Sequence, residues 1–106
     1  MGQLLIVDDE RSICEVLEIA FRKEGHGVDT AHSVAEARQK LQGRIYDIVV
    51  SDIKMPQASG LELLQYVRES HPDSLFILLT GYGSLETAMQ ALKLAFAALS
   101  CGLVSA

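Results

Sequence analysis

The sequence predicts an α/β fold built around a doubly wound parallel sheet. Short apolar runs of strand length alternate along the chain with longer segments whose apolar residues recur at helical spacing. The short runs are apolar throughout instead of alternating with polar residues, which indicates strands covered on both faces. The element order β-α-β-α-β-α-β-α requires right-handed crossovers, so helices are expected on both sides of the sheet.

Length and composition fit one ordinary globular domain. The 106 residues suffice for a single modest core, and 49% of them are hydrophobic while 22% are charged. A net charge of −5 argues against nonspecific nucleic-acid binding. No apolar run approaches the ~20 residues of a membrane span, and no signal-peptide pattern opens the chain. We therefore expect a cytoplasmic protein without direct nucleic-acid or membrane binding.

The first half of the chain predicts two strands and two helices. Gln3 to Val7 is a continuous apolar run, and Val28 to Ala31 is a shorter, weaker one. Residues 11–24 have helical periodicity, with one apolar face made by Ile13, Val16, Leu17 and Ala20. Ser33 and Glu36 form a capping-box pattern, in which each side chain satisfies a free backbone N–H. The helix that follows has an inner face of Val34, Ala37 and Leu41.

The second half repeats the alternation. Asp47 to Ser51 and Leu75 to Leu79 are the third and fourth predicted strands. Between them lies a third predicted helix. It begins with Gly60, Leu61, Leu64 and Val67 and ends near His71-Pro72. A fourth helix starts at Ser84, and its apolar face is Leu85, Ala88, Met89 and Leu92.

The segment after Leu94 admits two interpretations. Strong helix formers and the helical spacing of Phe96, Leu99 and Leu103 favour a continuation of the fourth helix, with Gly102 as its cap. Alternatively, residues 96–100 pair beside the fourth strand, because an uncovered apolar edge invites aggregation. We favour the continued helix, and we expect its surplus apolar surface to be buried in a homodimer.

Carboxylates follow two of the predicted strands at the point where each strand ends. Asp8 and Asp9 come after the first strand, and Asp52 ends the third. In the flavodoxin-like strand order 2-1-3-4-5 these strands are neighbours, and such sheets bind ligands beyond their carboxyl ends. Three converging carboxylates repel one another unless a cation is present, and oxygen-only ligands suit Mg²⁺. The sequence therefore predicts a magnesium site, with the backbone carbonyl of Lys54 as a further ligand.

A carboxylate beside magnesium can act as a nucleophile toward a phosphoryl group and form an aspartyl phosphate. Thr80 follows the fourth strand, on the same rim as Asp52, where its hydroxyl can reach a phosphoryl oxygen. Taken singly, an aspartate after a strand is usually a turn or cap residue, and Thr80-Gly81 is a common turn pair. The combination of acids after two strands with a hydroxyl after a third favours the functional interpretation.

The cysteines and histidines give no comparable pattern. Cys14 and Cys101 match no metal-ligand spacing, and we expect buried thiols and no disulfide. His26, His32 and His71 are scattered in predicted loops and element ends, so we expect surface residues and no zinc site.

These motifs resemble the receiver domain of two-component response regulators. The segments "LLIVDDE", "DIVVSDIKMPQASGLELL" and "LLTGYGSLETAMQALK" match that family's most recognisable motifs in order and spacing, over about residues 3–94. The last segment is most similar to receivers of nitrogen-regulation-type, σ54-dependent activators.

The resemblance implies a CheY-like fold and a phosphorelay signalling role for the chain. A sensor histidine kinase would phosphorylate Asp52, with Mg²⁺ bound by Asp8, Asp9, Asp52 and the Lys54 carbonyl, and Thr80 would sense the phosphoryl state. Such a domain is not an enzyme beyond Mg²⁺-dependent self-phosphorylation and slow autodephosphorylation.

The resemblance ends after Leu94. The family has a fifth strand carrying an aromatic residue and a lysine, followed by a fifth helix, whereas this chain reads "AFAALSCGLVSA". Ala98 takes the place of the aromatic residue and Cys101 that of the lysine. We therefore expect a receiver domain over residues 1–94, a divergent tail over residues 95–106, a fold truncated after the fourth helix, and impaired switching.

Two other functions remain open at this level. One is a degenerate receiver that only binds other proteins. The other, less favoured, is a magnesium-dependent phosphatase with an aspartyl nucleophile. Those enzymes typically carry a second acid two residues after the nucleophile, where this chain has Lys54.

Overall fold

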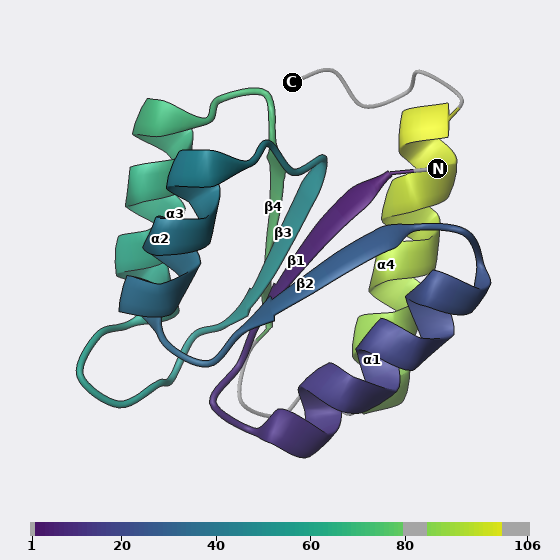
Figure 1. Cartoon of the computed structure of the whole chain (residues 1–106), viewed down its shortest axis with the longest axis horizontal. Coiled ribbons are helices and arrows are strands. Elements are labelled where there is room, and N and C mark those ends of the chain that lie inside the picture. The colour runs from purple at the N-terminus through teal and green to yellow at the C-terminus, as the bar shows by residue number, and fades with distance from the viewer. Residues whose placement is uncertain (1, 80–84, 101–106) are drawn as a thin grey trace.

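In the computed structural model, residues 2–79 and 85–100 are described, and in them four parallel strands alternate with four helices (Figure 1). The strands are β1 (Gln3–Val7), β2 (Gly27–Ala31), β3 (Ile48–Asp52) and β4 (Leu75–Leu79). The helices are α1 (Arg11–Lys23), α2 (Val34–Gly43), α3 (Gly60–Ser70) and α4 (Leu85–Ser100). The sheet order β2-β1-β3-β4 confirms the predicted doubly wound, flavodoxin-like parallel sheet.

The pairing of the two central strands brings the polar residues at their carboxyl ends close together. β1 pairs in parallel with β3, and Val7 lies opposite Ser51. The residues that follow, Asp8 and Asp52, therefore leave the sheet at the same edge. On the other side of β1, Val7 lies opposite Ala31, which brings the end of β2 to the same edge.

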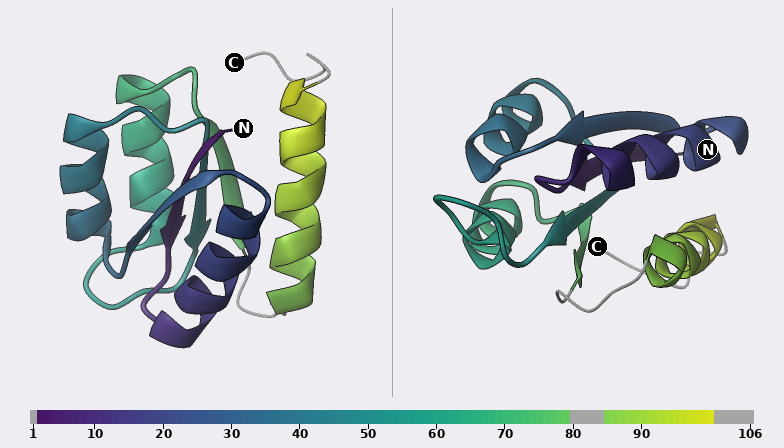
Figure 2. Two further views of the ribbon diagram at one scale, coloured as in Figure 1. Left: turned by 45° about the vertical axis from the view of Figure 1, so that its right-hand side comes forward. Right: turned by 90° about the horizontal axis from the view of Figure 1, so that it is seen from below.

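Each face of the sheet is covered by two helices (Figure 2). Successive strand residues point to opposite faces, so Leu4 and Ile6 belong to one core and Leu5 and Val7 to the other. The first core is closed by α1 and α4, through Cys14, Leu17, Phe21, Ala88, Leu92 and Phe96. The second is closed by α2 and α3, through Val34, Ala37, Leu41, Leu63 and Val67.

The rotation of α1 differs from the prediction. Its buried residues are Cys14, Leu17 and Phe21, whereas Val16, which was assigned to the inner face, is 41% exposed. Overlapping apolar stripes compete on this helix, and the stripe that includes the large Phe21 ring buries more area.

In α3 the buried residues are Gly60, Leu63 and Val67. Two residues that opened the predicted helix pattern lie elsewhere, since Leu61 is 54% exposed and Leu64 is half-buried. Gly60 lies so close to the end of β3 that a Cβ atom there would overlap the Asp52 carbonyl, so this position must face the strand.

The start of α2 is capped as predicted by Ser33, whose Oγ accepts a hydrogen bond from the Glu36 N–H (3.1 Å). The Glu36 carboxylate, however, accepts from the N–H of His32 (2.9 Å) and not from that of Ser33. A reciprocal capping box occurs instead at α3, between Ser59 and Glu62. The sequence pattern Ser59-Gly60-Leu61-Glu62 contains it, but it was not predicted.

The helical interpretation of the segment after Leu94 is confirmed as far as Ser100, and pairing of residues 96–100 beside β4 is wrong. Phe96 is buried against the first core and its ring stacks on His26, with 3.8 Å between centroids. The proposed helix start at Ser84, the cap at Gly102 and the contribution of Leu103 lie outside the described residues. The domain boundary at Leu94 stays a prediction.

β4 differs from the central strands in its exposure. All five of its side chains are only half-buried, although every one is apolar. Within residues 2–79 and 85–100, no strand pairs with its outer edge. In the same part of the chain, no helix has the length and apolar character needed to cross a membrane.

Candidate functional site

Three carboxylates meet at the carboxyl edge of the sheet, as the sequence predicted. Asp8 and Asp9 follow β1, and Asp52 is the last residue of β3. One carboxylate oxygen from each of the three lies within 4.8 Å of the other two. The convergence follows directly from the pairing of β1 with β3.

Asp8 is held rigidly by its neighbours. Its side chain is buried, and its N–H donates to the carbonyl of Ala31 (3.0 Å), which ties it to the end of β2. Its Oδ1 accepts a hydrogen bond from the backbone N–H of Glu10 (3.0 Å). The carboxylate is therefore presented in one orientation.

The environment of Asp8 disfavours its charged form. Burial raises the pKa of Asp8 to about 6, and the charges of Asp52 and Asp9 act in the same direction, while the hydrogen bond from Glu10 opposes them. A divalent cation among the three carboxylates would instead stabilise the charged form of Asp8. The donor set is all oxygen, and part of it is exposed, so these residues fit Mg²⁺.

The backbone around Asp52 is anchored on both sides. The Ile53 N–H donates to the Leu79 carbonyl (3.1 Å), and the Gly60 N–H donates to the Ile53 carbonyl (2.9 Å). A Cβ atom at Gly60 would overlap the carbonyl oxygen of Asp52. Glycine at position 60 thus lets α3 begin directly against the end of β3, and this contact holds Asp52 in place.

The loop after β3 contains Lys54, the predicted carbonyl ligand. Lys54 is exposed, and it lines a hollow of about 470 Å³ together with Ile53, Met55, Pro56 and Ser59. Gln57 in this loop has a φ of 74°, in the left-handed region. The carbonyl of Lys54 as a ligand stays a prediction. Thr80 and Cys101 lie outside the described residues, and Ala98 lies half-buried in α4.

Two side chains contact the backbone carbonyl of Asp8, and neither contact was predicted from the sequence. The Nδ1 atom of His32 lies 3.0 Å from the Asp8 carbonyl oxygen, and the Cys14 thiol donates to the same oxygen (3.5 Å). His32 was expected on the surface but is half-buried. It follows β2 just as Asp8 follows β1, so the rule that ligands gather at strand ends could have identified it.

Cys14 is a structural thiol. It is buried, as predicted, in the core beneath α1. Burial, together with the charge of Asp8, raises the pKa of Cys14 to about 11, so the thiol is protonated at neutral pH. It contributes packing and a hydrogen bond to this site, not a nucleophile.

Comparison with known proteins identifies the family. Residues 4–99 match the model of the response regulator receiver domain. The chain belongs to this family. It is 44% identical over 89 residues to the response regulator protein PilR of Pseudomonas aeruginosa, a match that covers 84% of this chain and 20% of PilR. The chain thus spans about a fifth of the length of that relative.

Solved receiver structures have the same fold. TrrA of Thermotoga maritima, in complex with Mg²⁺ and BeF, has a TM-score of 0.72 and 42% identity, covering 78% of this chain and 72% of TrrA. TrrA in complex with the histidine kinase ThkA matches equally well, with a TM-score of 0.72 and 42% identity over 79% of this chain and 72% of TrrA. The beryllofluoride-activated receiver dimer of NtrC4 has a TM-score of 0.71 and 37% identity, covering 86% of this chain and 75% of that one.

Proposed function

We propose that this receiver domain accepts a phosphoryl group on Asp52 from a sensor histidine kinase in a Mg²⁺-dependent reaction. The observation that carries the proposal is the meeting of Asp8, Asp9 and Asp52 at the carboxyl edge of the sheet. Membership of the receiver family supports it. We also propose that this is a cytoplasmic domain that acts through protein partners, which its receiver-family membership and its negative net charge support.

In the proposed reaction a carboxylate oxygen of Asp52 attacks the phosphorus of a phosphohistidine. An O–P bond forms while the P–N bond breaks, and its electron pair stays on the imidazole nitrogen. Asp8, Asp9, Asp52 and the Lys54 carbonyl would hold Mg²⁺, which supplies positive charge opposite the phosphoryl oxygens. The backbone N–H of Glu10 orients Asp8, and the close contact with Gly60 holds the backbone of Asp52 in place.

The structural relatives support the choice of ion and partner. TrrA has been solved with Mg²⁺ and BeF, and separately in complex with a histidine kinase. We carry both over to this chain as proposals: Mg²⁺ as the cofactor and a sensor histidine kinase as the phosphodonor.

The direct test is phosphorylation with a small phosphodonor. Incubation with Mg²⁺ and acetyl phosphate should add one phosphoryl group, detected by intact mass, and Asp52→Asn should abolish the addition. Asp73→Asn is the matched control, because Asp73 is exposed in the turn before β4, at the opposite edge of the sheet. Equal labelling of Asp52→Asn and the parent would show that another residue is the acceptor.

The same experiment separates the alternatives. A degenerate receiver would take up no phosphoryl group and would bind Mg²⁺ weakly in a titration. An aspartyl-nucleophile phosphatase would release phosphate over many turnovers instead of accumulating a phosphorylated chain.

We also propose that phosphorylation of this chain changes its conformation less than in a receiver with the lysine and aromatic residues in place. Ala98 lies within helix α4, so it does not present an aromatic ring on a fifth strand. Chemical-shift changes on adding beryllofluoride should stay near Asp52. Large shifts throughout α4 would contradict the proposal.

A further inference from the structure

The peptide group between Asp8 and Asp9 joins two of the three carboxylate residues of the candidate metal site. β1 ends at Val7, so the Asp8 carbonyl lies beyond the end of the strand. A peptide group is planar and rigid, and a hydrogen bond to its carbonyl oxygen therefore restrains the orientation of the whole group. Whatever holds the Asp8 carbonyl thus also restrains the two Cα atoms from which the side chains of Asp8 and Asp9 extend.

His32 is the stronger of two donors to this carbonyl. Its Nδ1 atom lies 3.0 Å from the Asp8 oxygen. A carbonyl oxygen can only accept a hydrogen bond, so Nδ1 carries a proton whether the ring is neutral or charged. The Cys14 thiol lies 3.5 Å from the same oxygen, and a thiol is a weak donor. The imidazole therefore supplies most of the restraint on the Asp8 carbonyl.

The imidazole is itself held at the start of α2. The N–H of His32 donates to the Glu36 carboxylate (2.9 Å), and the next residue, Ser33, caps the helix. The preceding residue, Ala31, accepts a hydrogen bond at its carbonyl from the Asp8 N–H (3.0 Å). Both backbone groups of Asp8 are thus bonded to consecutive residues, whose own positions are fixed by β2 and α2.

We propose that His32 is a positioning residue for the metal site, and that its Nδ1–H holds the Asp8-Asp9 peptide so that both carboxylates converge on Asp52. The inference rests on the proposed Mg²⁺ site and adds to it a residue that is not a ligand. The three carboxylates repel one another, and a restraint on the peptide opposes their separation. The ligands are then arranged before the ion binds, which strengthens binding.

A purely structural role for His32 predicts a different result. If the imidazole only satisfies the hydrogen-bonding capacity of a carbonyl, its loss lowers the free energy of unfolding but leaves the Mg²⁺ affinity of the folded chain unchanged. If it positions Asp8 and Asp9, its loss also weakens Mg²⁺ binding to chains that are fully folded. The affinity of the folded chain for Mg²⁺ therefore separates the two roles.

The test compares three replacements of His32 by calorimetric titration with Mg²⁺. Asparagine places its amide nitrogen near the position of Nδ1, whereas glutamine places its amide nitrogen nearer that of Nε2. His32→Ala should weaken binding about tenfold. His32→Asn should restore most of the affinity, and His32→Gln should not. Unchanged affinity in His32→Ala, or equal rescue by asparagine and glutamine, would overturn the proposal.

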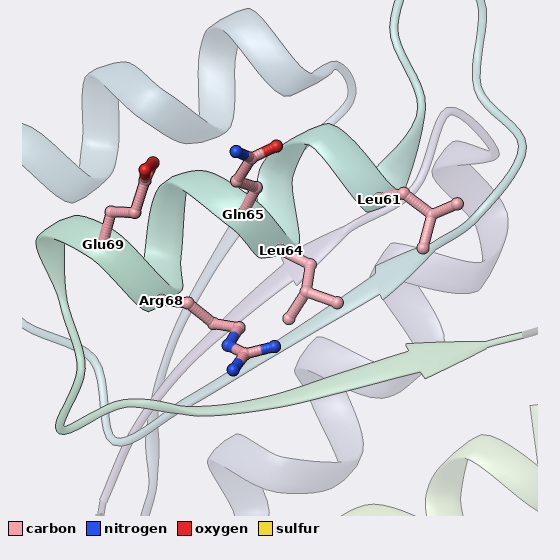
Figure 3. Close-up of a pocket in the computed structure, with 5 residues that line it drawn as sticks. All are labelled: Leu61, Leu64, Gln65, Arg68 and Glu69. Atoms are coloured by element: carbon pink, nitrogen blue, oxygen red, sulfur yellow. The ribbon is translucent and has the colours of Figure 1, made fainter.

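Gln65→Ala is the matched control for the loss of a polar side chain. Gln65 is exposed in the middle of α3, where it lines a hollow of about 400 Å³ on the helix (Figure 3). It belongs to neither β1 nor β2 nor the segments that follow them, so this variant should bind Mg²⁺ as the wild type does. Equal weakening by Gln65→Ala and His32→Ala would also overturn the proposal.

Nitrogen-15 spectra of the wild-type imidazoles give a second measurement that needs no variant. At neutral pH His32 should carry a proton on Nδ1. His26, whose Nδ1 accepts a hydrogen bond from the Gly2 N–H, provides the reference for an Nδ1 without a proton. Saturation with Mg²⁺ should shift the ring signals of His32 but not those of His26 and His71, which precede β2 and β4 at the opposite edge of the sheet. An unprotonated Nδ1 on His32, or no shift of its signals, would contradict the assigned role.

These outcomes are distinguishable from a failure of the proposed function. A wild-type chain that binds no Mg²⁺ would overturn the proposed function and this inference together. A wild-type chain that binds Mg²⁺ and takes up a phosphoryl group on Asp52, with His32→Ala equal to it in affinity, would overturn the role of His32 alone.

Discussion

β3 and β4 are neighbouring parallel strands of five residues each, yet they differ in burial and in what they present. In β3, Ile48, Val49, Val50 and Ser51 are fully buried, while β4 is more apolar but only partly buried along its whole length. β3 is central and ends in Asp52, which Gly60 holds in place. β4 lies at the border of the described sheet. Among the described residues, position in the sheet order, and not hydrophobicity, therefore decides which of the two strands is more deeply buried.

The largest expected effect comes from isoleucine truncation in the two strands. Ile48 and Ile77 contribute to the same core, but Ile48 is completely buried and Ile77 is not. Ile48→Ala should lower the free energy of unfolding by about 3–5 kcal/mol, because it leaves a cavity. Ile77→Ala should cost roughly 1–2 kcal/mol, since part of the side chain is already solvated. Urea denaturation measures both, and equal losses would show that β4 is covered in solution.

The second prediction concerns the end of β3. In Gly60→Ala the new methyl group collides with the Asp52 carbonyl, so stability should fall by about 2–3 kcal/mol and phosphorylation of Asp52 should slow. Gly43→Ala is the control, because a Cβ there meets no atom within 4 Å. Alanine favours a helix over glycine, so this control should be neutral or stabilised by up to about 1 kcal/mol.

The third prediction is the pH dependence of Mg²⁺ binding. The pKa of Asp8 is about 6, so the proton competes with the cation below that pH. Binding measured by calorimetry should be about tenfold weaker at pH 5 than at pH 7, if Asp8 alone controls it. In the absence of metal, the stability of the folded state has the opposite pH dependence. Because the pKa of Asp8 is raised in the folded state, that state binds the proton more tightly than the unfolded state does. The free energy of unfolding should therefore fall as pH rises from about 4 through 6. Constant affinity between pH 5 and pH 7 would contradict a metal site controlled by an Asp8 carboxyl with a raised pKa.

The smallest expected effect is the loss of stability when His26 is protonated. His26 lies in the loop before β2, where α4 packs against it. The Nδ1 atom of His26 accepts a hydrogen bond from the Gly2 N–H (3.1 Å), and the ring stacks on Phe96. Burial lowers the pKa of His26, and the positively charged amino terminus adds to this. The unfolded state then takes up the proton first, so stability should fall as pH drops below about 6.5. His26→Phe should reduce this dependence, and a thermal melt series from pH 7.5 to 5.5 would reveal it.

Much of the site could be predicted because it depends on chain order. Asp8, Asp9 and Asp52 each directly follow or end an apolar run, and parallel strands bring such positions to one edge whatever the packing details. His32 obeys the same rule but was overlooked, because a lone histidine in a loop has no distinctive spacing. The close approach of Gly60 to Asp52 could not be predicted, since it involves two elements whose separation only the folded chain defines.

The sequence by itself determined the succession of elements, the strand order expected of it, and the convergence of the three carboxylates. Periodicity, capping residues and strand-end chemistry are local properties, and crossover handedness restricts how they combine. Only the tertiary structure decided which stripe of α1 turns inward, that Leu63 and not Leu61 is buried, and that α4 lies on the face of α1. These outcomes depend on competition between similar apolar surfaces, where the contacts of Phe21 and Phe96 with distant segments outweigh local preference.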